Sequence, residues 1–156
     1  MYIFVILGII LSVYLMLAVN ASGFDINIAF YYIDSATILF MAIIVVPILA
    51  AAGLLKDFHN AFKLTLGRKK AECLKELRRA KAAIKLAMSS SLFAGAVSTL
   101  VECVRVGAKA GGWSEAGMGY SVALISLLYG FIICLILFPI NSRLEQKIAD
   151  FMESEE

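Results

Sequence analysis

Long runs of apolar residues alternate with short polar segments along this chain. The clearest run covers residues 116–142, in which no Asp, Glu, Lys or Arg occurs. A helix that crosses a hydrocarbon core of about 30 Å needs about 20 apolar residues. Similar runs begin near the start of the chain, near residue 35 and near residue 86. The pattern predicts four transmembrane helices, at about 2–22, 35–55, 86–105 and 118–140.

The composition agrees with a chain that lies mostly in a bilayer. Hydrophobic residues make up 62% of the sequence and charged residues 17%, whereas soluble domains are about 25% charged and about half apolar. We therefore expect an all-α membrane protein with one membrane domain over 1–156 and short cytoplasmic helical extensions.

The first apolar run does not have the features of a cleaved leader, and the second is expected to be kinked. No Lys or Arg precedes the first run, and a secretory signal has a positive n-region and a small-residue cleavage site. We therefore expect a retained helix at 2–22. Pro47 lies near the middle of the second run, where a proline usually kinks a helix.

Residues 56–85 form the one long polar segment, and they hold ten of the fourteen Lys and Arg residues. The positive-inside rule places this basic loop in the cytoplasm, and four spans then place both termini there too. The RKK run at 68–70 is expected to attract anionic lipid rather than nucleic acid, because lipid contact needs no further partner. Part of the loop is predicted to be a helix that continues into the third span, on the apolar stripe Leu74, Leu77, Ala80 and Ile84.

The C-terminal segment 142–156 is predicted to be a short cytoplasmic tail that follows the fourth span, which is expected to end near Pro139. Its apolar residues share one helical face and its charged residues the other, which is typical of an amphipathic helix. The apolar face comprises Leu144, Ile148, Phe151 and Met152.

Small and polar residues form a stripe on each of the last two spans. Small stripes let helix backbones approach closely in lipid, where the hydrophobic effect gives no drive for association. Two interpretations remain open: plain packing between helices, or a surface that faces a partner or water. The stripes are Ser91, Gly95, Ser98, Glu102 and Arg105 with Thr99 beside them, and Gly119, Ala123, Ser126, Gly130 and Cys134.

Glu102 is the acidic residue nearest to these stripes. The apolar run before it is about 24 Å long as a helix, which is shorter than the core of the bilayer. Glu102 therefore lies at the outer boundary or faces a wet or protein-lined space. It is equally compatible with an ion pair to Arg105, three residues further on.

No pattern of catalytic or metal-binding residues occurs, so we expect neither an enzyme nor a cofactor or metal site. The three cysteines have no C-x-x-C spacing and are interpreted as packing residues. His59 has no neighbouring ligand and is expected to be a solvated loop residue. A secondary transporter would need inverted repeats with broken helices, which Pro47 alone does not indicate.

Several short motifs near the C-terminus occur in a definite order. Residues 122–130 read VALISLLYG, and Pro139-Ile140 is followed by Leu144. These segments resemble V-A-L-L-T-T-L-Y-G and F-L-P-I-A-x-K-L of the MotA/TolQ/ExbB family of ion-channel subunits, and the MotA branch in particular. Residues 117–119 fall on its G-P-G, residues 98–100 on its G-T-L, and Gly95 on the glycine before that. Two other segments resemble the family more weakly. Residues 55–58 and 61–63 resemble the basic exit from its second span, and residues 32–34 resemble the F-I-D entry to that span.

The resemblance implies a homopentameric ring in the bacterial inner membrane, around two copies of a single-span partner of the MotB/ExbD type. In that family the partner's membrane aspartate carries a proton or a sodium ion, and the last two spans line the inside of the ring. By matching position, Thr99 faces that aspartate, and a hydroxyl can donate to a carboxylate or accept from a carboxylic acid. The implied ion-pathway and partner-facing residues are Gly95, Ser98, Thr99, Glu102, Ser126, Leu127 and Gly130.

Three departures distinguish this chain from the MotA branch. Leu127 replaces the second threonine of the T-T pair, with Ser126 beside it, and Glu102 replaces a glycine near the pore mouth. The large cytoplasmic domain between spans two and three is missing, since only residues 56–85 lie there.

Two hypotheses follow for the function. The first is an ion-driven motor subunit, a stator-like ring that converts ion flow into mechanical work. The second is a non-conducting membrane scaffold or assembly subunit of the same family that has lost ion coupling. A partner with an aspartate in its membrane span would favour the motor, and one without an ionisable group there would favour the scaffold.

Overall fold

The computed structural model describes residues 7–12, 15, 19–20, 23–24, 35–66, 73–109 and 113–153. The described residues are mostly helical, which confirms the expected helical class. The principal helices are α3 (Ser35–Ala51), α4 (Leu55–Thr65), α5 (Leu74–Lys109) and α6 (Trp113–Glu153). Two strands of two residues each, β1 (Val19–Asn20) and β2 (Gly23–Phe24), pair in antiparallel fashion.

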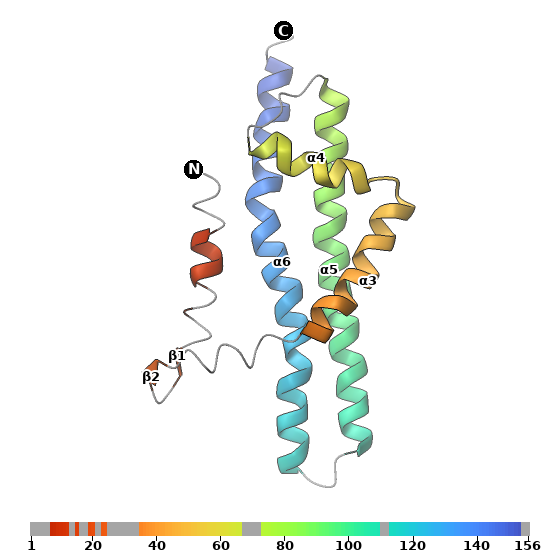
Figure 1. Cartoon of the computed structure of the whole chain (residues 1–156), viewed down its shortest axis with the longest axis vertical. Helices are drawn as coiled ribbons and strands as arrows, with labels where there is room; N and C mark the ends of the chain where they lie inside the picture. Colours follow the sequence, from red (N-terminus) through yellow and green to blue (C-terminus); the bar gives the residue numbers. More distant parts are fainter. Residues whose placement is uncertain are drawn as a thin grey trace.

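Helices α5 and α6 form a long antiparallel hairpin (Figure 1). They contain 36 and 41 residues, so they are about 54 and 62 Å long. Among the described residues, these two helices are each long and apolar enough to cross a membrane, and the bent α3 and α4 pair would be a third span if it counts as one. The predicted spans 86–105 and 118–140 lie inside α5 and α6. Four spans and a five-membered ring remain predictions.

The predicted first span at 2–22 lies largely outside the described residues. Residues 7–12 are helical, as expected. The prediction is wrong at its C-terminal end, where Val19 pairs with Phe24 and Asn20 with Gly23. Val19 and Phe24, a β-branched and an aromatic residue, are of types that favour strands.

The second predicted span, 35–55, ends four residues early because the chain turns sharply at Gly53. The Leu54 N–H donates to the Leu49 carbonyl at 2.9 Å and the Gly53 N–H to that of Ala50 at 2.9 Å. With a φ of +66° at Gly53, these bonds form a Schellman motif, which ends a helix at a left-handed residue. The bend of 99° between α3 and α4 follows this motif, whereas Pro47 lies inside α3.

The described parts of the basic segment 56–85 are mostly helical. Its first part belongs to α4, which crosses both α5 and α6 (Figure 1), and its last part is the first three turns of α5. The expected helix that continues into the third span is thereby confirmed. The helix at α4 was missed because its buried face is short, consisting of Ala61, Leu64 and Thr65.

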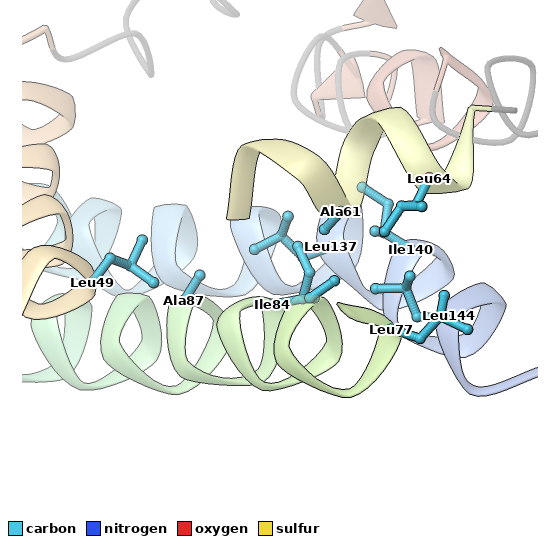
Figure 2. Packing of buried hydrophobic residues seen from close by; sticks show 10 residues of the cluster. Leu49, Ala61, Leu64, Leu77, Ile84, Ala87, Leu137, Ile140 and Leu144 are labelled. Atoms are coloured by element: carbon cyan, nitrogen blue, oxygen red, sulfur yellow. The ribbon is translucent and has the colours of Figure 1, made fainter. Parts of the chain in front are cut away.

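The main apolar cluster lies where α4 crosses the hairpin (Figure 2). Leu64 of α4 and Ile140 and Leu144 of α6 are at most 1% exposed. The predicted stripe on α5 faces this cluster, since Leu77 and Ile84 are likewise almost fully buried. The full cluster comprises Leu49, Ala61, Leu64, Leu77, Ala80, Ile84, Ala87, Leu137, Ile140 and Leu144.

The tail expected from residue 142 onward is helical as far as Glu153, and it continues α6 through Pro139 without a break. Ile140 and Leu144 pack in the apolar cluster on the far side of that proline. We infer that this packing outweighs the loss of one backbone hydrogen bond at Pro139. Ile148 and Phe151 pack at the edge of the same cluster, as their shared face predicts, whereas Met152 is exposed.

Polar contacts fix α4 to the hairpin at both of its ends. At the first end, the Arg79 Nε donates to Asp57 at 3.0 Å and its Nη2 to the Gly53 carbonyl at 3.3 Å. At the other end, the Lys147 ammonium donates to the Leu64 carbonyl, where a cation is favoured by the helix dipole. Burial, together with the charge of Arg143, lowers the pKa of Lys147.

Candidate functional site: the seam between helices α5 and α6

The two small-residue stripes face each other along the line where α5 and α6 touch. We call this line the seam. It consists of Ser91, Gly95 and Thr99 on α5 and of Ala123, Ser126 and Gly130 on α6.

Glycines bring the two backbones of the seam together. A Cβ atom added at Gly95 would lie 2.7 Å from the Ser126 carbonyl oxygen and 3.3 Å from the Leu127 Cα. At Gly130 it would lie 3.0 Å from the Ser91 carbonyl oxygen. Both neighbours are backbone atoms, so a side chain at either position would push the helices apart. This is the close approach that small residues permit in membrane helices.

Thr99 lies at the seam, and its hydroxyl is engaged. Its Oγ1 donates a hydrogen bond of 3.0 Å to the Ala123 carbonyl oxygen, and the residue is 8% exposed. A hydroxyl has one donor and two acceptor lone pairs. In this geometry the proton of Thr99 is directed to Ala123, and the lone pairs are left to accept a hydrogen bond or to bind a cation.

The other hydroxyls predicted for the site differ in their surroundings. Ser126 is buried in the seam, 5% exposed. The Oγ of Ser98, one residue before Thr99, is buried without a hydrogen-bond partner in the part of the chain that the structure describes. Leu127, which stands where the family has its second threonine, is partly buried. Gly95, Thr99, Ser126 and Gly130 thus come together, with Ser98 and Leu127 next to them in sequence.

Glu102 forms the ion pair that its spacing allows. Its Oε2 lies 3.4 Å from the Nε of Arg105, and the glutamate side chain is 39% exposed. The carboxylate is therefore neutralised by a neighbour on the same helix. Its predicted role in ion entry is untested.

The seam realises the plain-packing interpretation within one chain. The slim sides of α5 and α6 contact each other, and bulky apolar side chains point outward from both helices. Whether the seam also borders a central axis depends on other chains, so the ion-pathway assignment remains a prediction. The outward residues include Phe93, Val97, Leu100 and Val104 on α5 and Val122, Phe131, Leu135 and Phe138 on α6.

One seam contact was not expected from the sequence. The Cys134 Sγ lies 3.2 Å from the Met88 carbonyl oxygen, as a thiol that donates to the backbone of α5. The signal was present, because Cys134 continues the small stripe of α6 at a step of four from Gly130. This contact extends the seam by one turn towards the apolar cluster.

The remaining candidates for chemistry are dispersed. Cys103 and Cys134 are partly buried, and Cys73 is exposed; all three are free thiols. His59 is exposed as expected, but it lies on α4 rather than in a loop. Over the described ranges, no group of three His, Cys, Asp or Glu side chains is close enough to hold a metal ion.

The fold and the seam define a helical protein with a hairpin of membrane-crossing length whose two helices pack through small and hydroxyl-bearing residues. Comparisons of this chain with protein-family models, with curated proteins and with solved structures found no match. A functional assignment therefore has to come from the residues of the seam and from the sequence motifs.

Proposed function

We propose that this chain is the membrane subunit of a proton- or sodium-driven motor. Five copies would form a ring in the bacterial inner membrane, with both termini in the cytoplasm. The ring would surround a single-span partner of the MotB/ExbD type that carries an aspartate in the membrane. Ion flow past that aspartate would move the ring and its partner relative to each other and so perform mechanical work.

The observation that carries the proposal is the position of Thr99. The motif resemblance assigns this residue to the ion pathway, and its hydroxyl lies in the closely packed seam, 3.0 Å from the Ala123 carbonyl oxygen. A polar group at this depth is costly in lipid unless a partner satisfies it. The seam provides that partner and holds the hydroxyl in one orientation.

This orientation has a consequence for ion transfer. With its proton directed to Ala123, the Thr99 oxygen can accept a hydrogen bond from a protonated carboxyl group or bind a sodium ion. An ionised carboxylate accepts hydrogen bonds only, so it gains a bond from Thr99 only if the hydroxyl turns away from Ala123. Loading and unloading of the partner's carboxyl group would thus be coupled to a change of hydrogen bonding at the seam.

The charge distribution supports the proposed orientation in the membrane. Exposed cations occur on α4 and on the first turns of α5, for example Lys56, Lys63, Lys75 and Arg78. Basic segments next to membrane spans are typical of the cytoplasmic side.

A second candidate is a non-conducting scaffold subunit. It is favoured by the engagement of Thr99 within its own chain and by Leu127, which removes one of the two hydroxyls of the family pattern. In this case the seam would serve packing only, and the ring would hold a partner without moving ions.

A flux measurement separates the two candidates. The chain would be reconstituted in liposomes with the single-span protein encoded by a neighbouring gene, and proton and sodium uptake would be followed under an applied potential. We expect uptake with both proteins present, and none when the partner's membrane aspartate is replaced by asparagine. Formation of the complex without uptake of either ion would contradict the motor and favour the scaffold.

A further inference from the structure

The end of the hairpin that α4 crosses bears opposite charges on the outer sides of its two helices. We call this end the stalk; it comprises residues 74–85 of α5 and 141–153 of α6. We propose that the basic face of α5 in the stalk binds the acidic face of α6 in the stalk of a second copy of this chain. The inference rests on the proposed function, because it names a contact that joins neighbouring copies of the ring.

The outer face of α5 in the stalk is basic. Lys75, Arg78 and Lys85 are exposed and follow one another with Ala82 at steps of three and four, so they lie on one side of the helix. None of the three cations forms an ion pair with a residue that the structure describes. A small residue at Ala82 leaves room for another helix to approach.

The outer face of α6 in the stalk is acidic. Glu145, Asp150 and Glu153 are all exposed, with Ala149 among them. The cations on this part of α6 are directed inward, since Lys147 donates to the Leu64 carbonyl and Arg143 is partly buried. Glu145 contacts Lys81 of its own chain but remains 60% exposed. The contact with Lys81 also lowers the pKa of Glu145, so this carboxylate is charged at neutral pH.

The two faces overlap along the hairpin axis at the level of Lys75, Arg78 and Glu145, and Lys85 and Glu153 extend from this level in opposite directions. Contacts of Gly95 with Ser126 and of Met88 with Cys134 set the register of α5 against α6. At 1.5 Å per residue, Glu145 lies at about the level of Lys75 and Arg78, and Asp150 about one turn further from the membrane.

Insertion in one bilayer holds all copies at one height and relates them by rotation about the membrane normal. Two different complementary faces then make a head-to-tail contact, and such contacts close into a ring when the rotation between neighbouring copies divides a full turn evenly. The basic face of one copy would therefore meet the acidic face of the next at the level where both are exposed.

The extent of the basic face favours a second copy over anionic lipid. From Lys75 to Lys85 the face runs about 15 Å along the hairpin axis. With the third span expected to begin at residue 86, the plane of lipid headgroups would meet the Lys85 end of the face only. The acidic face of a neighbouring copy at the same height meets the other end of the basic face, at Lys75 and Arg78, which lies about 10–15 Å further along the axis than Lys85.

Charge reversal tests the contact in the full chain purified in detergent. The variant K75E/R78E should shift the assembly towards the monomer by tenfold or more in dissociation constant, measured by native mass spectrometry at low salt. The control K56E/K63E makes the same change of charge on α4, outside the stalk, and should leave the mass of the assembly unchanged. Adding D150K/E153K to K75E/R78E inverts both faces and should restore the assembly.

Salt gives a second measurement that needs no variant. Raising the salt from about 0.01 M to about 1 M shortens the screening length from about 30 Å to about 3 Å, so the wild-type assembly should dissociate. If circular dichroism shows that K75E/R78E is unfolded, the salt dependence of the wild-type assembly decides whether the contact exists.

Several results would overturn the proposal: a monomeric wild type, an assembly indifferent to salt and to K75E/R78E, or no rescue by D150K/E153K. Loss of binding to phosphatidylglycerol vesicles at unchanged mass would assign the basic face to lipid instead. The proposed function is judged separately, because ion flux with an unaltered K75E/R78E assembly would refute the contact and leave the motor in place. An assembly that is sensitive to salt and restored by D150K/E153K, but that moves no ion, would support the contact and refute the motor.

Discussion

Replacement of Gly95 by Ala is expected to destabilise the chain, although an alanine normally stabilises a helix relative to glycine. The added Cβ would lie 2.7 Å from the Ser126 carbonyl oxygen, and relief would require that α5 and α6 separate along the seam. Overpacking of this kind costs about 1–3 kcal/mol. The measurement is the free energy of unfolding of the purified protein in bicelles.

Two glycines of α6, Gly130 and Gly117, make a graded series with Gly95 of α5. At Gly130 the closest contact would be 3.0 Å, to the Ser91 carbonyl oxygen, so the loss should be smaller. At Gly117 nothing lies within 4 Å of an added Cβ, so Gly117→Ala should be neutral or gain up to about 1 kcal/mol from helix propensity. Equal stability of the Gly95 and Gly117 variants would show that the seam is not closely packed.

Replacement of Thr99 by Val is expected to lower ion flux strongly while the protein still folds and assembles. Valine keeps the shape of threonine and removes the hydroxyl. Hydrogen bonds between membrane helices contribute about 0.6 kcal/mol on average, so stability should change little. An unpaired polar group in the pathway costs about 1–3 kcal/mol, and 1.36 kcal/mol is tenfold in rate. We therefore expect flux in liposomes to fall by about tenfold or more.

The conservative variant Thr99→Ser completes this experiment. It keeps the hydroxyl and its reach to the Ala123 carbonyl, so it should retain most of the flux. If Thr99→Val lowers the stability slightly and leaves the flux unchanged, Thr99 serves packing only and has no part in ion transfer.

The spacing of small residues predicted which sides of α5 and α6 permit close contact, and Gly95 and Gly130 lie there as expected. The sequence left open which neighbour fills that space. A stripe of small side chains permits close contact with a neighbouring helix, and that helix can belong to the same chain or to another chain. The structure places the partner stripe in the same chain, through Thr99 and Ala123.

The errors at helix ends have a common physical origin. Helix α6 continues through Pro139 because Ile140 and Leu144 are held by the apolar cluster beyond it. The short helix α4 depends on the same cluster, because contacts with α5 and α6 bury its Leu64. Contacts between elements far apart in the sequence decide both cases, whereas local residue preferences were sufficient for the stripe on α5.

Cryo-electron microscopy of the chain purified with its single-span partner tests the central claim most directly. The motor account predicts copies of the hairpin arranged around the partner's helix, with α5 and α6 nearest to the axis and Thr99 at the height of the partner's carboxyl group. A complex in which α5 and α6 face lipid around its outer edge, with the partner bound elsewhere, would contradict it.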